Sequence, residues 1–235
     1  MTTSRQDGGD SLSGTSVLIA GATGGLGSAI ARNLDARGAT LTLVSRSTDR
    51  LAALDLPGHR IALDLRDPDA CQTAVRETLL YGGRIDVVIN AVGAVAFGPI
   101  AELSVDVLEE LFLTNTFLAV WLAEAALASL GEGGVIVNIS GVIAEHNLPD
   151  MAAYGASKAA VRSFDEALAR EARRHRVRVI DARPPHTETG LTDRPVGGKA
   201  PNMPWGLDPD FVAEVICDAI VGDVTDLPSS AFGSP

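Results

Sequence analysis

The sequence predicts an α/β fold in which helices cover both faces of one doubly wound parallel sheet. Three observations predict it. Short β-rich segments alternate with longer helical segments along the chain. Most of the short segments are apolar at successive positions, as strands are when both faces of their sheet are covered. A glycine-rich stretch, Gly21–Gly27, joins the first strand-like segment to the first helical one. Alternation of this kind implies right-handed crossovers and a parallel sheet.

The expected elements follow one another in chain order. Six segments are expected to be strands: Val17–Ala20, Leu41–Val44, Ile61–Leu63, Asp86–Asn90, Val135–Ile139 and Val177–Ala182. The long segments between them are expected to be helices: Leu26–Arg37, Pro68–Tyr81, Ser104–Leu130 and Met151–Arg174. A further helix is expected at Pro209–Val221, where Asp208 can serve as the N-cap. The usual last strand of such a sheet is at best abbreviated here, with Leu227 at the start of a remnant.

The chain of 235 residues is expected to form one domain, over residues 15–235, because no internal linker interrupts the alternation. Residues 1–14 are polar and lack an apolar core, so they are expected to be a flexible lead and not a secretory signal. Residues 183–206 are rich in Pro and Gly. A loop of that length in a compact domain is usually a functional lid or disordered, and we expect it to be a substrate loop.

Charge and composition argue against several classes of function. The formal net charge of −11 argues against nucleic acid or an anionic membrane as a partner, because binding to phosphates needs basic patches. No apolar run is expected to reach the ~18–20 residues of a membrane span, since the closest, Phe117–Leu130, is shorter and is broken by Glu124. Cys71 and Cys217 lie outside any metal or redox spacing, so they are expected to be inert, no metal site is expected, and a cytoplasmic protein is indicated.

The stretch Gly21–Gly27 (GATGGLG) predicts a nucleotide site. Its glycines permit a tight turn and then a close approach of the backbone to phosphate oxygens. The helix that follows supplies unpaired N–H groups and a favourable dipole. A glycine-rich loop alone is a weak signal. Its position between a strand and a helix strengthens the prediction, because the binding mechanism requires that context.

The end of the second strand, Val44-Ser45-Arg46, favours NADP(H) over NAD(H). An acidic residue there would accept a hydrogen bond from the adenosine ribose 2′-OH, whereas a small hydroxyl followed by a guanidinium suits a 2′-phosphate. The alternative is that Arg46 is a solvated loop arginine. Asp64, just after the third strand, is either a turn residue or an acceptor for adenine. Asn90–Gly93 ends the fourth strand, at the sheet edge where ligands of such folds bind.

Tyr154 and Lys158 are the most informative pair in the chain. Four residues apart on a helix, they project from the same face. A nearby positive charge favours phenolate, so we expect the pKa of Tyr154 to be lowered from its ordinary value of ~10. Such a phenol could donate or accept a proton at neutral pH. The alternative for the pair alone is an exposed helix with an incidental Tyr and Lys.

Asn115 places an amide on the apolar stripe of the expected helix Ser104–Leu130. A buried amide without partners costs about 1–3 kcal/mol. Asn115 is therefore either a core amide that the protein satisfies or a site residue that holds water. The stripe comprises Leu108, Leu111, Phe112, Asn115, Ala119 and Leu122.

These elements together resemble the short-chain dehydrogenase/reductase family, over about residues 12–189. Gly21–Gly27 matches the family's TGxxxGxG loop, with Ala20 where Thr is usual. Asn90–Gly93 stands for its NNAG motif, and Asn115 lies 25 residues after Asn90, where the family has its catalytic Asn. The resemblance implies a Rossmann-like domain that transfers hydride between the nicotinamide and an alcohol or carbonyl carbon.

The resemblance extends to the chemical end of the chain. Tyr154 and Lys158 match the family's YxxxK motif, and Pro184–Thr189 matches the PGxxxT stretch that contacts the nicotinamide carboxamide. By this resemblance Tyr154 would exchange a proton with the substrate oxygen. Lys158 would lower the pKa of the phenol and hold the nicotinamide ribose, and Asn115 would anchor a proton-relaying water. The cofactor performs the redox step, while the protein orients and polarises.

The motifs and the resemblance give two sets of expected site residues. The catalytic set is Tyr154, Lys158, Asn115 and Ser140. The cofactor-binding set is Gly21, Thr23, Gly24, Gly25, Leu26, Gly27, Ser45, Arg46, Asp64, Leu65, Asn90, Ala91, Gly93, Tyr154, Lys158, Pro184, Thr187 and Thr189.

The sequence departs from the family at a catalytic Ser, which is expected 13 positions before the Tyr. Gly141 occupies that position, and Ser140 lies one residue earlier. Either a one-residue shift lets Ser140 reach the carbonyl oxygen, or no hydroxyl is present and water or a loop residue such as His146 substitutes. Pro185 stands where Gly is usual and excludes a left-handed turn there. His186 could touch substrate, although a lone loop His is more often a surface residue.

We therefore expect a cytoplasmic, NADP(H)-dependent oxidoreductase that interconverts a small ketone or aldehyde and an alcohol. The substrate pocket is expected from residues 94–99, 143–151 and 183–206. Met151, Met203 and Trp205 either give it an apolar lining or serve ordinary packing. Phe117–Leu127 is apolar nearly all round, which indicates burial against another subunit or, alternatively, a helix covered within its own fold. The family resemblance implies a homodimer or homotetramer through these helices. The rival interpretation is a dinucleotide-binding sensor or scaffold with degraded chemistry. The retention of the Tyr, Lys and Asn argues against that rival.

Overall fold

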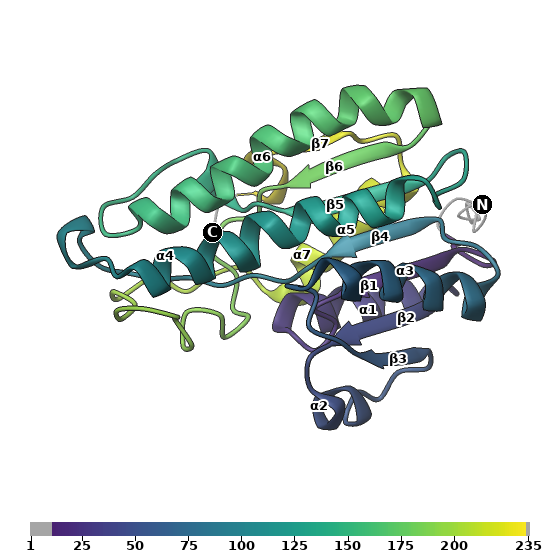
Figure 1. The fold of residues 1–235 in the computed structure, drawn as a ribbon, viewed down its shortest axis with the longest axis horizontal. Coiled ribbons are helices and arrows are strands. Elements are labelled where there is room, and N and C mark those ends of the chain that lie inside the picture. The colour runs from purple at the N-terminus through teal and green to yellow at the C-terminus, as the bar shows by residue number, and fades with distance from the viewer. Residues whose placement is uncertain (1–10, 234–235) are drawn as a thin grey trace, which may run out of the picture.

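The computed structural model describes residues 11–233 and contains one seven-stranded parallel sheet (Figure 1). The strand order is β3-β2-β1-β4-β5-β6-β7, and every neighbouring pair is parallel. The order runs in opposite directions on the two sides of β1, which is the switch point of a doubly wound sheet. The predicted fold class is confirmed. The strands are β1 Ser16–Ala20, β2 Thr40–Ser45, β3 His59–Ala62, β4 Val87–Asn90, β5 Val135–Ile139, β6 Arg178–Ala182 and β7 Asp226–Leu227.

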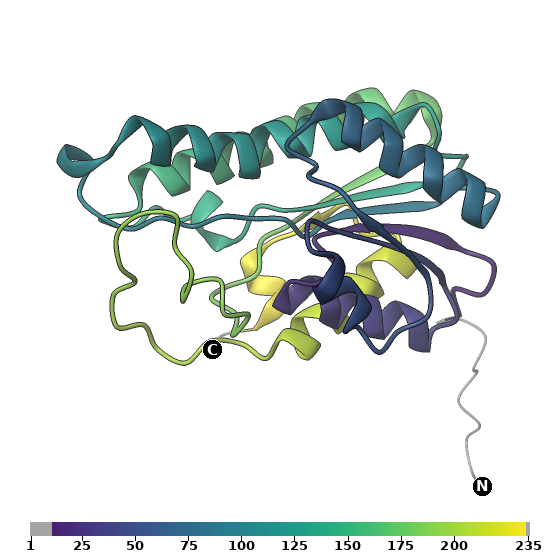
Figure 2. The ribbon, with the colours of Figure 1, turned by 60° about the horizontal axis from the view of Figure 1, so that its bottom comes forward.

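Helices cover both faces of the sheet, as predicted (Figure 2). The longer helices are α1 Gly25–Ala36, α3 Pro68–Gly82, α5 Leu118–Leu127, α6 Ala152–Ala172 and α7 Pro209–Val221. α1 and α7 pack on one face, where Ile30 and Ile216 belong to one hydrophobic core. α3, α5 and α6 pack on the other, where Leu122 and Leu168 belong to a second core. The sheet is therefore buried on both faces, which explains its run of apolar strands.

Two helices begin where local chemistry predicts. In α7 the Asp208 side chain accepts a hydrogen bond from Asp210 N at 2.7 Å, with proline in the first turn, as expected. α3 begins in the same way after Asp67. Cys71 in α3 and Cys217 in α7 are both buried, and burial raises the pKa of each to about 12. Neither thiol is a reactive thiolate at neutral pH.

The predicted helix Ser104–Leu130 is not one regular helix. It consists of α4 Val105–Leu111, a π-helical segment Phe112–Phe117 and α5. The extra residue per turn in a π segment rotates the stripe that regular helical spacing predicts. Leu108 is consequently 37% exposed, whereas Leu111, Asn115 and Leu122 are buried. π segments of this kind are frequent at functional sites.

Other boundaries differ from prediction by a few residues. β3 begins at His59, two residues earlier than expected. A short helix α2, Thr48–Ala52, was not predicted, and it begins where Ser47 Oγ accepts from Arg50 N at 3.2 Å. The last strand is a two-residue remnant, as expected, and pairs Leu227 with Ala182. Residues 183–206 contain no helix or regular strand and follow the predicted loop.

The N-terminal lead is only partly described. Its residues 1–10 lie outside the described residues. Leu12 is buried in the core that α1 helps to form, and its backbone N–H donates to Arg37 O at 2.8 Å. The chain is therefore anchored to the domain from Leu12 onwards, three residues earlier than the predicted boundary at residue 15.

The helical run Val105–Leu127 is long and apolar enough, by length and composition, to cross a membrane, and its most apolar 18-residue window has a mean hydropathy of 1.3. The expectation that no segment reaches this length is wrong by that measure. In the fold, Leu118, Leu122 and Ala126 are buried among the residues of the second core. The apolar composition of this run serves the packing of a core helix.

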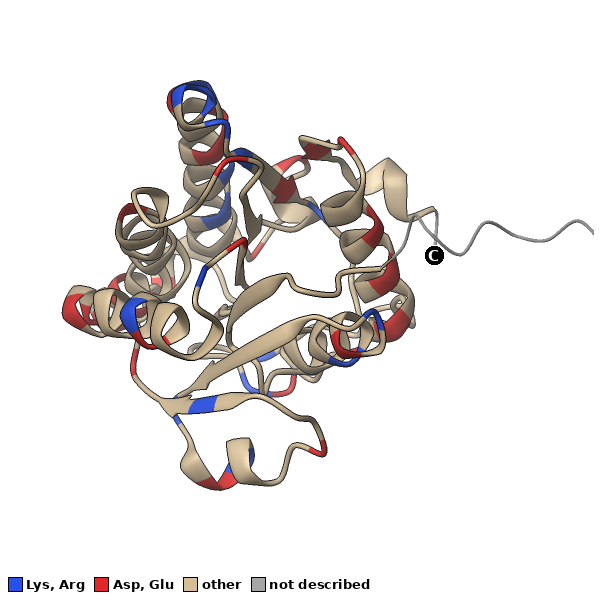
Figure 3. Cartoon of the chain, turned by 90° about the vertical axis from the view of Figure 1, so that its right-hand side faces the viewer, with Lys and Arg blue, Asp and Glu red and all other residues tan. Residues whose placement is uncertain are grey.

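Charged residues are distributed over several helices and loops (Figure 3). Arg32 of α1 lies 2.6 Å from Asp210 of α7, and Arg37, directly after α1, lies 2.5 Å from Asp218 of α7. Exposed pairs of this kind typically contribute ~0–1 kcal/mol. The two helices are held together mainly by their shared apolar core.

Candidate active site

A cavity of about 700 Å³ lies at the carboxyl ends of the central strands. Such a volume is within the ~300–1,000 Å³ range of ligand-binding clefts. The predicted residues that line it are Gly21, Thr23, Gly24, Gly25, Leu26, Ser45, Arg46, Asp64, Leu65, Ala91, Gly93, Ser140, Tyr154, Lys158, Pro184, Thr187 and Thr189. Gly27, Asn90 and Asn115 are not in its lining. The structure therefore brings most of the predicted site together in one space.

The glycine-rich loop has the shape that a bound pyrophosphate requires. Gly21 has φ of +80°, and a Cβ there would lie 2.9 Å from the backbone of Ala91. A Cβ on Gly27 would lie 2.2 Å from Gly21 O, so Gly27 permits the tight turn without lining the cavity. α1 starts beside this loop with no side-chain cap and no acidic residue in its first turn. Its first N–H groups are thus suited to an anion.

Asn90 supports the loop after β4 without entering the cavity. Its Oδ1 accepts a hydrogen bond from Val92 N at 3.2 Å, and its Nδ2 donates to Asn138 Oδ1 at 3.1 Å. Asn90 and Asn138 are paired in register on neighbouring strands. Asn90 is therefore a positioning residue for Ala91–Gly93, which does line the cavity.

The end of β2 gathers polar and cationic groups. Thr23 Oγ1 and Ser45 Oγ lie 2.6 Å apart, and Arg46 is exposed beside them. Arg50, which sequence reasoning missed, donates a hydrogen bond to Thr23 O and lines the same cavity. Ser47 is the sequence feature that could have pointed to Arg50. A serine is a favoured N-cap, and the helical turn that begins there contains Arg50. Two guanidinium groups, not one, lie at this end.

Asp64 lies in the lining, but its carboxylate is already paired. Arg66 donates to it from the backbone N–H at 3.1 Å, from Nε at 3.0 Å and from Nη2 at 2.6 Å. The hydrogen bonds from Arg66 hold the pKa of Asp64 below its usual value. Arg66 also pairs with Glu110 of α4 at 2.8 Å. Asp64 is thus a turn residue in the structure, and its contact with adenine stays a prediction.

Tyr154 and Lys158 both line the cavity from the first turns of α6. Burial raises the pKa of Tyr154 to about 12, opposite to the direction expected from the sequence. Burial also lowers the pKa of Lys158 to about 8, and its Nζ donates to Ile139 O at 2.7 Å. The expected direction was wrong because removal of the phenol from water favours its neutral form, and this is the cause of the shift.

Two buried carboxyl groups oppose the desolvation of Lys158. Asp181 of β6 and Asp165 of α6 both raise its pKa. Asp165 Oδ1 accepts from Asn138 Nδ2 at 2.7 Å, while Oδ2 is buried without a hydrogen-bond partner among residues 11–233. Burial raises the pKa of Asp165 well above its usual value. The ammonium and the two carboxyl groups form one buried polar cluster below the cavity.

The Asn115 side chain is satisfied by the protein itself. Its Oδ1 accepts from Ala94 N at 2.8 Å, and its Nδ2 donates to Ala94 O and to Ser157 Oγ, each at 2.9 Å. Three of the four hydrogen-bonding positions of the amide are used. Of the two alternatives, the structure shows the core amide. Asn115 therefore joins the segment after β4 to α6, because Ser157 is a residue of α6. The Ser157 hydroxyl in turn donates to Tyr154 O at 2.8 Å.

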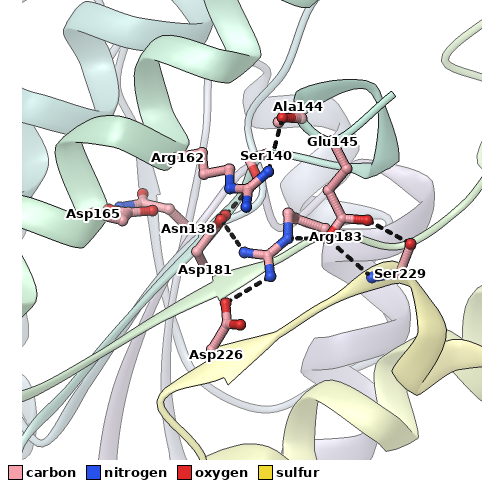
Figure 4. A network of polar contacts seen from close by, with 10 residues as sticks. All are labelled: Asn138, Ser140, Ala144, Glu145, Arg162, Asp165, Asp181, Arg183, Asp226 and Ser229. Carbon is pink, nitrogen blue, oxygen red and sulfur yellow. Dashed lines mark hydrogen bonds and ion pairs between the residues drawn. The ribbon is translucent and has the colours of Figure 1, made fainter. Parts of the chain in front are cut away.

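Ser140 is buried, and its hydroxyl donates to Asp181 Oδ1 (Figure 4). Asp181 also accepts from Arg183, which contacts Glu145 and lies 2.6 Å from Asp226. The hydroxyl therefore belongs to a structural network between β5, β6 and the C-terminal segment. Gly141 has φ of +80° and supplies no hydroxyl. The structure favours the alternative in which this position offers no side-chain donor.

Residues 183–206 lie against the strand ends. Val142 N donates to Pro184 O at 3.0 Å, and Thr187 Oγ1 donates to Pro185 O at 2.9 Å. The backbone of Thr189 lies so close to the phosphate loop that a Cβ on Gly25 would be 2.6 Å from Thr189 O. Thr187 and Thr189 both line the cavity, and their contact with a nicotinamide stays a prediction.

The two loop histidines have different surroundings. His146, the proposed substitute for a missing hydroxyl, is exposed and lies outside the lining of the 700 Å³ cavity. The structure does not place His146 at the site, although Ile143 and Leu148 on either side of it line the cavity. His186 does line the cavity, and so does its neighbour Pro185.

The substrate end is closed by a parallel bridge between the loop and the segment after β4. Val196 N donates to Val95 O at 2.8 Å, and Phe97 N donates to Gly197 O at 3.0 Å. Met151 and Met203 line the cavity, as predicted, but Trp205 is 84% exposed and does not. A second cavity of about 280 Å³ shares Phe97, Met151 and Tyr154 with the first. The sequence therefore predicted which segments line this end of the cavity, but not which side chains of those segments face it.

Comparison with known proteins agrees with this geometry. The family model described as short chain dehydrogenase matches residues 15–196. Dehydrogenase/reductase SDR family member 7B of Bos taurus is 36% identical over 191 residues, which are 75% of this chain and 59% of that protein. The chain therefore spans about 59% of the length of this relative. The 3-ketodihydrosphingosine reductase of Mus musculus is 30% identical over 95% of the chain and 72% of that protein.

Solved structures share the fold over nearly the whole chain. A short chain dehydrogenase from Burkholderia cenocepacia J2315, in complex with NADP, has a TM-score of 0.81 and 26% sequence identity. The match covers 94% of this chain and 98% of that one.

Proposed function

This chain belongs to the short-chain dehydrogenase family, and we propose that it interconverts a small ketone or aldehyde and the corresponding alcohol with NADP(H). The observation that carries the proposal is the single cavity in which Gly21, Thr23–Leu26, Arg46 and the Tyr154–Lys158 pair meet. A dinucleotide would extend from the α2 end of this cavity, across the phosphate loop, to α6. The residues fit such a ligand because the loop has the required glycines and α1 has an uncapped N-terminus.

Two guanidinium groups support the preference for NADP(H). Arg46 and Arg50 line the cavity beside Ser45 and Thr23, and β2 ends without an acidic residue. A 2′-phosphate suits paired guanidinium groups, which bind phosphate oxygens with charge-assisted hydrogen bonds. The NADP complex of the Burkholderia protein, which shares the fold, agrees with this preference.

In the reduction direction the bound cofactor would supply the hydride, and Tyr154 would supply the proton. A phenol with a pKa raised to about 12 is fully protonated at neutral pH, which suits a donor to a developing alkoxide. Lys158 would hold the nicotinamide ribose and stabilise the phenolate that remains. Asp165 and Asp181 favour its charged form, which this role requires.

Asn115 would act through its position. Its amide is engaged with Ala94 and Ser157, so a relay water would bind the backbone of the π-helical segment Phe112–Phe117 and not the amide itself. The amide would keep that segment, the strand end and α6 in fixed relation. A buried side chain with satisfied hydrogen bonds is well suited to such a role.

A panel of small ketones and aldehydes, monitored by NADPH absorbance and repeated with NADH, tests the proposal. We expect NADPH oxidation with at least one carbonyl compound, and a smaller kcat/KM with NADH. An NADH preference would contradict the argument from Arg46 and Arg50. Tight NADPH binding without turnover of any compound would favour the sensor or scaffold alternative, which the missing hydroxyl at Gly141 motivates.

We further propose a homodimer or homotetramer. Phe117 is 48% exposed, and its ring centroid lies 5.8 Å from that of Trp121 on the same side of the helix. An exposed Phe117 beside a half-buried Trp121, on a helix whose only charged residue is Glu124, suits an interface between subunits. A cytoplasmic location, and the absence of nucleic-acid and membrane partners, stay predictions from composition.

A further inference from the structure

We propose that Asp165 is a positioning residue for the cofactor: through Asn138 and Asn90 it fixes the loop after β4, which lines the cavity. The inference rests on the proposed dinucleotide site. It assigns a binding role to a buried carboxyl group that lies outside the lining of the cavity. Asp165 acts through the two amides and touches neither cofactor nor substrate.

A chain of three hydrogen bonds joins α6 to the loop after β4. Asn138 Nδ2 of β5 donates to Asp165 Oδ1 at 2.7 Å, and both residues are drawn in Figure 4. Asn90 Nδ2 of β4 donates to Asn138 Oδ1 at 3.1 Å. Val92 N donates to Asn90 Oδ1 at 3.2 Å. The four residues therefore form one continuous path from a helix, across two strands, to the backbone of the cavity wall.

The order of donors and acceptors along this chain is fixed at its loop end. A backbone N–H can only donate, so Asn90 must present its oxygen to Val92 and its NH2 group to Asn138. Asn138 must then present its oxygen to Asn90 and its NH2 group to Asp165. An acceptor is therefore required at the far end of the chain, and a carboxyl oxygen can accept there in either protonation state.

The surroundings of Asp165 give its carboxyl group little else to do. The residue is 2% exposed, and its Oδ2 has no hydrogen-bond partner among residues 11–233. A buried carboxyl group with an unpartnered oxygen costs stability. Its one described hydrogen bond goes to Asn138, at the start of the chain that leads to the loop. The cost in stability is thus linked to the position of the cavity wall.

The loop that the chain reaches lies between two parts of the proposed cofactor site. Ala91, Val92 and Gly93 all line the cavity. A Cβ on Gly21 of the phosphate loop would lie 2.9 Å from the backbone of Ala91. A Cβ on Gly93 would lie 3.6 Å from Lys158 Nζ. Because the loop is this close to both groups, a small displacement of Val92 would disturb the phosphate loop and the lysine together.

A second, separate attachment holds the same loop at Ala94. Asn115 Oδ1 accepts from Ala94 N at 2.8 Å, and neither residue belongs to the chain that ends at Asp165. Ala94 N therefore serves as an internal reference. Loss of the chain should free the N–H of Val92 and leave that of Ala94 protected, whereas a general loosening of the domain would affect both.

Asp165→Asn and Asp165→Leu form a matched pair of variants. The Asp, Asn and Leu side chains share one branched shape, and both replacements are uncharged, so the two variants differ in whether an acceptor faces Asn138. Any effect of the lost charge on Lys158 is common to both. Glu166→Leu is the control, because Glu166 follows Asp165 on α6 but its side chain is 71% exposed.

The experiment measures NADPH dissociation constants by fluorescence and backbone amide hydrogen exchange of the apoprotein by NMR. In Asp165→Leu we expect the dissociation constant to rise about fivefold or more, as loss of a buried hydrogen bond would cause. Exchange at Val92 should become about tenfold faster through local opening, with little change at Ala94. Asp165→Asn keeps the acceptor, so it should resemble the wild type in both measurements, as should Glu166→Leu.

Equal NADPH dissociation constants in Asp165→Asn and Asp165→Leu would overturn the inference and leave the proposed function intact. Exchange that accelerates as much at Ala94 as at Val92 would also overturn it, since that result describes general loosening. A wild type that binds neither NADPH nor NADH would overturn the proposed function and this inference with it.

If Asp165→Leu does not fold, the wild type alone decides. The side-chain NH2 groups of Asn90 and Asn138 should then exchange far more slowly than that of Asn202, which is exposed. Slow exchange of both groups would support the chain of hydrogen bonds. Exchange as fast as that of Asn202 would overturn the inference.

Discussion

The hydroxyl of Ser140 donates a hydrogen bond to the carboxylate of Asp181, across the paired strands β5 and β6. A serine at this point of the chain could either polarise a substrate carbonyl or make a structural hydrogen bond, and this contact shows the second. A hydroxyl that serves a buried carboxylate is not free to polarise a substrate. The side chain of Ser140 is therefore part of the scaffold below the site.

Ser140→Ala should consequently lower stability and not turnover. Loss of the hydroxyl removes one hydrogen bond to a buried charged group, and the free energy of unfolding should fall by about 1–3 kcal/mol. Urea titration of the apoprotein measures this change, with the exposed Ser163→Ala as the control. A tenfold or larger loss of kcat with unchanged stability would return Ser140 to the catalytic set.

Asp165 should make stability depend on pH. Burial raises the pKa of this carboxyl in the folded state, so the folded protein binds a proton that the unfolded chain releases above its ordinary value of ~3.9. This contribution is present below the unfolded pKa and is lost as pH rises through the folded one. Asp165→Asn should therefore gain stability relative to wild type as pH rises from ~4 toward the folded-state pKa, by about 1 kcal/mol or more.

Denaturant titrations at several pH values measure that difference, with Asp55→Asn as an exposed control. A stability difference that is independent of pH would mean that Asp165 is ionised in the folded state.

Tyr154→Phe should abolish proton donation while preserving cofactor binding. The phenolic hydroxyl is the proposed acid, and positioned acids contribute ~10²–10⁴-fold to rates. We expect kcat to fall in this range and the dissociation constant for NADPH to stay close to that of the wild type. Tyr81→Phe is the matched control, because Tyr81 is 51% exposed and stacks on His59. Retained turnover in Tyr154→Phe would exclude the proposed mechanism.

The double variant Arg46→Ala, Arg50→Ala should lose its preference for NADPH. Hydrogen bonds to charged groups contribute about 1.5–3 kcal/mol, so KM for NADPH should rise by one to two orders of magnitude. KM for NADH should change little, because NADH has no 2′-phosphate. Arg76→Ala, on the exposed surface of α3, controls for loss of a positive charge. Equal effects on both cofactors would show that these arginines bind a part common to the two.

Phe117→Glu should shift the protein toward a monomer. A carboxylate in the centre of an apolar interface costs several kcal/mol when buried without a partner. Sedimentation velocity measures the species present. Leu80→Glu is the control, because Leu80 is 73% exposed on α3 and is not part of the proposed interface. A wild type that sediments as a monomer would contradict the proposal directly.

Local chemistry made most of the fold predictable. Apolar runs such as Val135–Ile139 are strands because both faces of the sheet are covered, and Asp208 caps α7 through a contact two residues away. The phosphate loop was predictable for the same reason, since its glycines and the strand before it adjoin in sequence.

What could not be predicted depends on distant partners. The π-helical segment exists where Asn115 reaches Ala94, on another part of the chain. The direction of the pKa shift of Tyr154 depends on burial, which no local pattern gives. The orientation of Ser140 is decided by Asp181, 41 residues later. Each of these is a tertiary effect that outweighs the local signal.

The bridge that closes the substrate end limits how that end could be redesigned. Gly198 has φ of +69°, and a Cβ on it would overlap Phe97 O at 1.7 Å. Mutant libraries that aim to widen the choice of ketones should leave this glycine untouched. Variation belongs at Val196 and Met203, which line the 700 Å³ cavity and do not have a positive φ. The loop therefore has one contact, at Gly198, that leaves no room for a side chain, and two cavity-lining positions where the side chain can be varied.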